Sequence, residues 1–241
     1  MLKIDSHLHV WAHEPDKYPY RAGGGEPSSR GDVEYLLELQ EEAGVSGALI
    51  VQPIFHGFDH RYVTDVLRRY PDRFVGMALA DPVAPDAVDQ LRRLVEEDGY
   101  RGVRLNPNLW PDSESMDGAT GYRLMEYCAE AQIAAGFLID PSHFADVSAL
   151  CKRYPEATTI IDHFGRVGPD RPDDIAALID LHKHPNLYVK VSGFPVSSRQ
   201  EWPYADMSGV VHRLIDAFGV ERLMFATDFP HIVRQCGYSE G

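Results

Sequence analysis

Short apolar runs alternate with longer amphipathic stretches along the 241-residue chain. Eight runs are rich in Val, Ile, Leu and Phe without strict polar alternation, and they cover residues 2–10, 47–53, 74–80, 102–106, 135–140, 158–164, 187–193 and 223–230. Strands that are buried on both faces of a parallel sheet have this pattern. The sequence therefore predicts eight parallel strands.

Seven amphipathic stretches between the runs predict helices over residues 33–43, 61–70, 85–97, 122–132, 145–154, 173–182 and 207–218. Asp32 is the expected N-cap of the first helix and Gly44 its stop. Two other helices are expected to end at Tyr70 and Tyr154, because each precedes a proline and proline cannot continue a helix. Strict alternation of strand and helix predicts a single (β/α)₈ TIM-barrel domain over residues 1–241.

A doubly wound sheet is the alternative fold, but it usually has fewer strands and a glycine loop for phosphate after the first. Here the first run ends in histidines instead. Because Gly241 follows soon after the eighth run, we expect all or part of the last outer helix to be missing. Either the sequence is truncated or the barrel closes in another way. Residues 11–31 are expected to form a long loop at the active-site mouth of the barrel.

Charge and cysteine content narrow the range of partners. The chain has 37 acidic and 23 basic residues, and this negative surface makes nucleic acid and anionic membranes poor partners. Three cysteines without a CxxC pair, no signal peptide and no membrane-length apolar run predict a cytoplasmic protein. A small anionic substrate remains compatible, because a few arginines can reverse the field inside a pocket. The sequence leaves open whether the chain forms a homo-oligomer.

The first run contains a pair of histidines, His7 and His9. Residues two apart in a strand project to the same side, so the two imidazoles are expected to point together. Such a pair can bind a metal ion or an oxyanion. A lone histidine is more often a hydrogen-bonded core residue, but a pair at this position favours a functional site.

The sixth run ends in Asp-His-Phe-Gly-Arg, which places His163 at the expected barrel mouth. Gly165 would let the backbone turn sharply. Arg166 could bind a carboxylate through two hydrogen bonds, with a surface or loop-bracing role as the alternative.

The eighth run carries a carboxylate, Asp228, near the end of an apolar segment. Burial of an unpartnered carboxylate is costly, so Asp228 must face donors, cations, a metal or water. We therefore expect it to act as a general base that activates a water molecule. The structural alternative is a salt bridge to Arg104 or Lys190.

Other polar residues near the ends of the runs are evenly balanced between substrate binding and scaffold roles. Lys190 lies within a predicted barrel strand and needs a partner, which could be Asp228 or a substrate carboxylate. The candidates for substrate binding besides Arg166 are Arg104, Asn106, Lys190 and Gln52.

Three motifs, Asp-Ser-His-Leu-His at 5–9, Asp-His-Phe-Gly-Arg at 162–166 and Ala-Thr-Asp-Phe-Pro-His at 226–231, resemble the amidohydrolase superfamily. More narrowly, they resemble its lactonase-like branch, which includes 2-pyrone-4,6-dicarboxylate lactonase and sugar-acid lactonases. The resemblance covers nearly the whole chain and implies a TIM-barrel hydrolase.

The resemblance also implies roles for the site residues. In members that use a divalent metal such as zinc or manganese, the matching residues surround the ion, and here these are His7, His9, His163 and Asp228. The dicarboxylate lactonase is described as working without metal. There the counterpart of Asp228 activates water, that of His163 polarises the carbonyl, and arginines matching Arg104 and Arg166 hold the substrate. No lysine on the fourth or fifth run is available to bridge two metals.

These residues support one leading hypothesis and two alternatives. The leading hypothesis is the opening of a lactone or related cyclic ester of a small organic acid by water that Asp228 activates. The first alternative is metal-dependent, non-oxidative decarboxylation of an aromatic acid. The second is a barrel that binds a ligand without turning it over.

Overall fold

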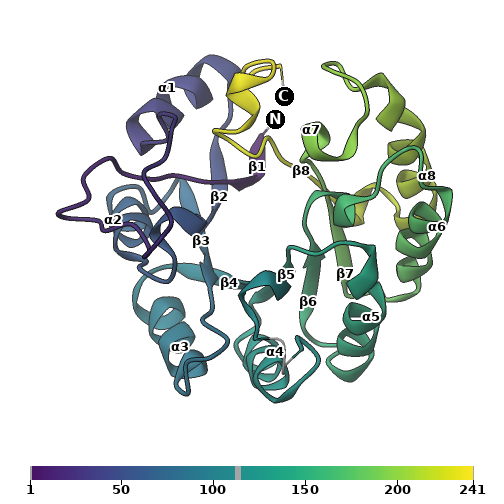
Figure 1. Cartoon of the computed structure of the whole chain (residues 1–241), viewed down its shortest axis with the longest axis horizontal. Coiled ribbons are helices and arrows are strands. Elements are labelled where there is room, and N and C mark those ends of the chain that lie inside the picture. The colour runs from purple at the N-terminus through teal and green to yellow at the C-terminus, as the bar shows by residue number, and fades with distance from the viewer. Residues whose placement is uncertain (1, 112–114, 241) are drawn as a thin grey trace.

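A computed structural model of the chain describes residues 2–111 and 115–240. Its eight strands are all parallel, and each one pairs with the next along the chain (Figure 1). The predicted barrel is confirmed. The strands are β1 (Ile4–Leu8), β2 (Gly47–Val51), β3 (Phe74–Leu79), β4 (Tyr100–Leu105), β5 (Ala134–Phe137), β6 (Thr158–Ile161), β7 (Leu187–Val191) and β8 (Leu223–Phe225).

The helices form a ring outside the strands (Figure 1). The seven predicted helices are present as α1 (Val33–Ala43), α2 (Arg61–Arg69), α3 (Ala87–Glu97), α4 (Ala119–Ala131), α5 (Phe144–Arg153), α6 (Pro172–Asp180) and α8 (Ser208–Phe218). Asp32 caps α1 by accepting a hydrogen bond from the Tyr35 backbone N–H, and Gly44 ends it at φ 66°. A short helix that the pattern did not predict, α7 (Phe194–Ser197), follows β7.

Two apolar clusters hold the barrel together. The larger one packs the helices against the outer face of the strands. The smaller one joins Val51 of β2, Met77 of β3 and Ile160 of β6. Because β6 lies far from β2 and β3 around the sheet, these side chains can meet only across the barrel interior. The barrel interior at the level of these three residues is therefore filled with apolar side chains, as is usual for the fold.

The barrel closes at a seam between β1 and the segment that follows β8. The backbone N–H of Asp228 donates to the carbonyl of His7 at 3.0 Å, and the N–H of His9 donates to the carbonyl of Phe229 at 2.8 Å. These bonds join the end of β1 to the segment that follows β8. The barrel is thus closed by the same residues that carry its candidate chemistry.

Asp5 fastens this seam from within. Its buried carboxylate accepts hydrogen bonds from the Thr227 hydroxyl at 2.5 Å, the Thr227 N–H at 3.1 Å and the Tyr238 hydroxyl at 3.1 Å. The His7 N–H donates to it at 3.2 Å. One side chain therefore connects β1, the segment after β8 and the C-terminal segment.

The chain after β8 does not follow the usual outer-helix pattern. Within the described part of the chain, which runs to residue 240, this segment contains a 3-10 helix at Ile232–Arg234 and no α-helix. It lies beside α1 (Figure 1), where the Gln40 amide donates to the Tyr238 hydroxyl at 3.4 Å. Ile4 and Phe225, on the adjoining strands β1 and β8, are each 52% exposed.

The predicted strand ends are wrong by several residues. β1 ends before His9, β6 before His163 and β8 before Asp228. The apolar runs continue past each strand because residues such as Phe164 and Phe229 are buried in turns. His9, His163 and Asp228 accordingly lie on connecting segments at the C-terminal ends of the strands, whereas His7 lies within β1. Among the described residues, no helix has the length and apolar character needed to cross a membrane.

We expect Asp5→Ala to destabilise the fold by about 3 kcal/mol, because it leaves several buried donors without an acceptor. Tyr238→Phe is the matched control: it removes one of the same hydrogen bonds and is expected to cost about 1 kcal/mol. Urea denaturation measures both. Equal unfolding midpoints for the two variants would contradict the role given to Asp5.

Candidate active site

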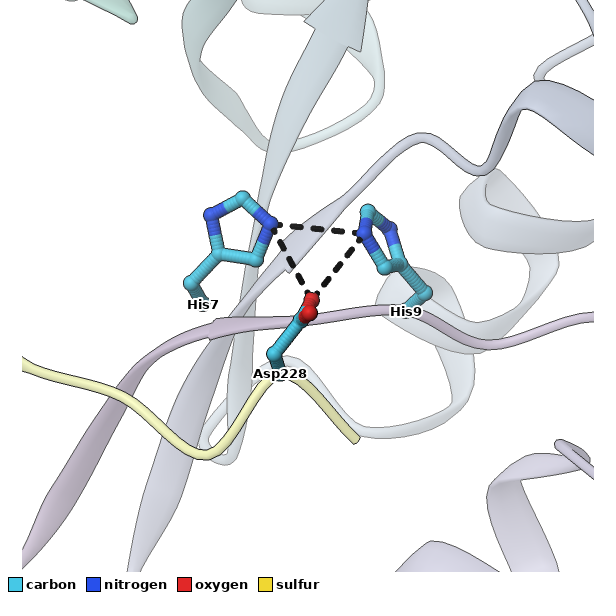
Figure 2. A group of neighbouring side chains, drawn as sticks. All are labelled: His7, His9 and Asp228. Carbon is cyan, nitrogen blue, oxygen red and sulfur yellow. Dashed lines mark hydrogen bonds and ion pairs between the residues drawn. The ribbon is translucent and has the colours of Figure 1, made fainter. Parts of the chain in front are cut away.

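Three side chains meet at the seam between β1 and the segment after β8 (Figure 2). The Nε2 atoms of His7 and His9 are 3.3 Å apart. Oδ1 of Asp228 lies 3.7 Å from the first and 3.6 Å from the second. Nε2 of His163, from the turn after β6, is 3.9 Å from the same oxygen. The four residues predicted to form the site are therefore brought together.

Asp228 is held in an unusual backbone conformation. Its φ of 60° lies in the left-handed region, which aspartate tolerates better than most residues. Oδ1 is buried and has no hydrogen-bond donor among the described residues. A buried carboxylate oxygen without a donor is costly, so this atom is suited to receive water, a substrate hydrogen or a cation.

Hydrogen bonds at Nδ1 hold the imidazole rings of His9 and His163 in place. Nδ1 of His9 lies 2.8 Å from the carbonyl oxygen of Val51. A carbonyl can only accept, so Nδ1 of His9 carries a proton and its Nε2 offers a lone pair to the site. Nδ1 of His163 is hydrogen-bonded to the Ser192 hydroxyl at 2.9 Å. In both residues, Nε2 faces Asp228.

A charged layer lies beneath these residues, inside the barrel. The ammonium of Lys190 on β7 is 2.9 Å from Nδ1 of His7 and 3.1 Å from Oδ1 of Asp162. The same Asp162 oxygen is 3.3 Å from Nδ1 of His7, and Nη1 of Arg104 is 4.0 Å from the other oxygen. The side chains of His7, Lys190 and Asp162 have no solvent exposure.

Burial is the largest influence on the pKa values of the site residues. It lowers the pKa of His163 to about 4 and holds the pKa of His7 and His9 well below their usual range, so all three are neutral near pH 7. Burial raises the pKa of Asp228 to about 7, against the opposing field of Arg104. Burial also opposes ionisation of Asp162, but Lys190, His7 and His163 together outweigh it and hold the pKa of that carboxyl well below its usual value.

The turn after β6 adopts a strained backbone. His163, Phe164, Gly165 and Arg166 all have φ between 53° and 59°. Left-handed residues that are not glycine cost energy, and they cluster at functional sites. Gly193 faces this turn at φ 66°, and a Cβ on it would lie 2.7 Å from Cβ of His163. The expected sharp turn at Gly165 is present, and Gly193 makes room for the imidazole.

A cavity of about 610 Å³ opens beside three of the four residues, while His7 lies beneath it. This volume suits a small organic molecule. His9, His163 and Asp228 line it, as do three of the predicted substrate-binding residues, Arg104, Asn106 and Arg166.

Two of the predicted substrate-binding residues lie elsewhere. Gln52 is buried, and its amide donates to the backbone carbonyls of Gly57 and Asp59 at 3.0 and 2.9 Å, so it braces the loop after β2. Lys190 lies below the cavity and does not line it. Its partner is Asp162, and not Asp228, which was one of the two partners expected from the sequence. Among the described residues, Asp228 makes no salt bridge with Arg104 or Lys190.

Several residues that shape the site were not predicted from the sequence. Asp162 directly precedes His163 at the end of an apolar run, and a carboxylate there was a usable signal. Trp11, His231 and Arg234 also line the cavity. Arg234 donates to the Ser28 hydroxyl at 3.0 Å and so links the loop after β1 to the C-terminal segment. The spacing of these residues along the chain does not predict their meeting.

The donor set partly fits a divalent metal. One ligand atom each from His7, His9 and Asp228 lie within 4.8 Å of one another. The free Oδ1 of Asp228 and the lone pair on His9 Nε2 are suitable ligands. His163 lies beside this group rather than in it.

Comparisons with known proteins find relatives over most of the chain. The amidohydrolase family model matches residues 4–241. The chain is 30% identical to 4-sulfomuconolactone hydrolase from Hydrogenophaga intermedia, over 94% of this chain and 74% of that protein. It is 26% identical to L-fucono-1,5-lactonase from Burkholderia ambifaria, over 95% and 80%. A crystal structure of a zinc-bound amidohydrolase from Burkholderia multivorans shares the fold, with a TM-score of 0.80, 22% identity and coverage of 100% and 88%.

The environment of Asp228 predicts that one aspartate carboxyl titrates near pH 7 in the free protein, above the usual range, because burial disfavours its charged form. NMR of protein labelled with ¹³C at the aspartate carboxyl carbons measures this directly. The signal should vanish in Asp228→Asn and persist in Asp216→Asn, which changes an exposed residue of α8. If every aspartate titrates in the ordinary acidic range, the described burial of Asp228 is wrong.

Proposed function

We propose that this chain, which belongs to the amidohydrolase family, hydrolyses a lactone of a small anionic organic acid. One observation carries the proposal: a half-buried carboxylate, Asp228, with one buried oxygen faces a cavity among neutral histidines, with arginines on the cavity wall. Two curated relatives that match most of the chain are named as lactone hydrolases, which supports the same chemistry.

Asp228 acts as the general base in this proposal. Its ionised Oδ1 accepts a proton from water, and the water oxygen adds to the lactone carbonyl carbon. When the tetrahedral intermediate collapses, the ring C–O bond breaks and the proton passes from Asp228 to the departing oxygen. The products are a carboxylate, a hydroxyl group and one released proton. A base with a pKa of about 7 is well matched to both transfers.

The developing negative charge on the carbonyl oxygen needs donors in the same cavity. Nε2 of His163 lies 3.9 Å from Asp228 Oδ1. A lactone carbonyl attacked by the water that Asp228 activates would therefore lie close to this imidazole. Donors that are fixed before the reaction stabilise an oxyanion strongly in a site that excludes water. A divalent metal would be held by Oδ1 of Asp228 and the lone pair on Nε2 of His9, and it would supply the same polarisation as a Lewis acid.

The cavity wall favours an anionic substrate even though the protein is acidic overall. Arg104, Arg166 and Arg234 line it together with Asn106. Guanidinium groups bind carboxylates and similar oxyanions through paired hydrogen bonds. The sulfonate-bearing substrate named for the 4-sulfomuconolactone hydrolase relative has a charge of this sign.

Asp228→Asn tests the proposed base. The amide has nearly the same shape but cannot accept the proton from water, so kcat/KM for lactone opening should fall by about 10²- to 10⁴-fold. A panel of sulfonated, carboxylated and sugar-acid lactones, followed by pH-indicator assay, gives the measurement.

Asp216→Asn on α8 is the control and should retain wild-type turnover, because Asp216 is exposed on an outer helix and does not line the cavity. Full activity of Asp228→Asn on a lactone that the wild type opens would refute the assigned base.

A further inference from the structure

The contact between Lys190 and His7 has a consequence for the chemistry of the site. The ammonium group carries three N–H donors and no acceptor. It lies 2.9 Å from Nδ1 of His7, inside the barrel and out of contact with solvent. Nδ1 of His7 must therefore be the acceptor in this bond, and in a neutral imidazole the proton then resides on Nε2.

His9 has the opposite arrangement. Its Nδ1–H donates to the Val51 carbonyl, so its Nε2 carries the lone pair. The two Nε2 atoms are 3.3 Å apart, and a donor on His7 meets an acceptor on His9. The contacts of both rings are thus satisfied by one pair of tautomers, with the His7 N–H also directed toward Oδ1 of Asp228 at 3.7 Å.

We infer that Lys190 is a positioning residue that fixes His7 as an N–H donor toward His9 and Asp228 rather than as a metal ligand. The tautomer follows from the contacts alone. Its consequence for Asp228 as the base, whose Oδ1 lies 3.7 Å from Nε2 of His7, rests on the proposed function.

Asp162 supplies the competing arrangement. Its Oδ1 is 3.3 Å from Nδ1 of His7, close enough to accept a proton from that nitrogen after a small shift. In that state Nε2 would offer a lone pair, as in the carboxylate–histidine–metal groups of many metalloenzymes. Lys190 prevents this state because its ammonium donates a hydrogen bond to Nδ1 of His7 and forms an ion pair with the Asp162 carboxylate. A single buried lysine thus selects between two chemistries for the same histidine.

The resting tautomer can be read without any substrate. In ¹⁵N-histidine-labelled wild-type protein at pH 7 treated with chelator, long-range ¹H–¹⁵N correlation spectra distinguish protonated from unprotonated ring nitrogens. His7, assigned by its loss in His7→Asn, should show a protonated Nε2 and an unprotonated Nδ1. A protonated Nδ1 with an unprotonated Nε2 would overturn the inference.

Lys190→Met tests whether the lysine sets this state. Methionine fills similar space but cannot donate, so the His7 proton should move to Nδ1 and bind Asp162. Zinc affinity, measured by competition with a chromophoric chelator, should rise by about tenfold or more, since partners behind a ligand change metal affinity by about 10- to 100-fold. An unchanged tautomer or unchanged zinc affinity would overturn the role of Lys190.

Ser192→Ala is the matched control. Ser192 is buried in the same region and bonds Nδ1 of His163 instead of His7. It should leave the His7 tautomer as in the wild type. If Lys190→Met does not fold, the wild-type spectrum still decides the tautomer. If the tautomer is as inferred but no lactone is opened, the proposed function fails and the role of Lys190 stands.

Discussion

The ion pair between Lys190 and Asp162 is the interaction on which the rest of the site depends. It joins β7 to the end of β6 where neither group reaches solvent. A buried charge without its partner costs about 3–5 kcal/mol, so these two residues must stay together in the folded chain. Their shared contact with His7 ties the inner end of that imidazole to the barrel. The state of His7 toward His9 and Asp228 is therefore set by buried groups that do not line the cavity.

A second constraint acts from the barrel seam. Asp5 binds both the N–H and the hydroxyl of Thr227, and the next residue is Asp228. The N–H of Asp228 itself closes the barrel on the carbonyl of His7. The position of the base is therefore part of the closure of the sheet. This explains how a carboxylate with an unpartnered oxygen and a left-handed backbone is tolerated: the hydrogen bonds on either side of it hold the fold together.

The sequence was sufficient for the architecture because eight apolar runs and seven amphipathic stretches have different periods. It also identified His7, His9, His163 and Asp228, which are polar residues at the ends of apolar runs. It could not give the partner of Lys190. Asp162 and Asp228 are both carboxylates at such positions, and only the path of the chain around the barrel decides which one meets β7. Strand ends were overestimated for a related reason, since buried residues in turns are as apolar as those in strands.

Arg104, one of the arginines that suit the cavity to an anion, also affects the pKa of Asp228, the proposed base. Burial alone would raise the pKa of Asp228 further, and the charge of Arg104 opposes this rise. An anion bound at Arg104 adds negative charge near Asp228 and so weakens that opposition. In the proposed reaction, anion binding would therefore raise the pKa of Asp228 above its value of about 7, which strengthens the base but lowers its ionised fraction near pH 7. A cation on the cavity wall would thus link substrate recognition to the proton affinity of the carboxylate beside it.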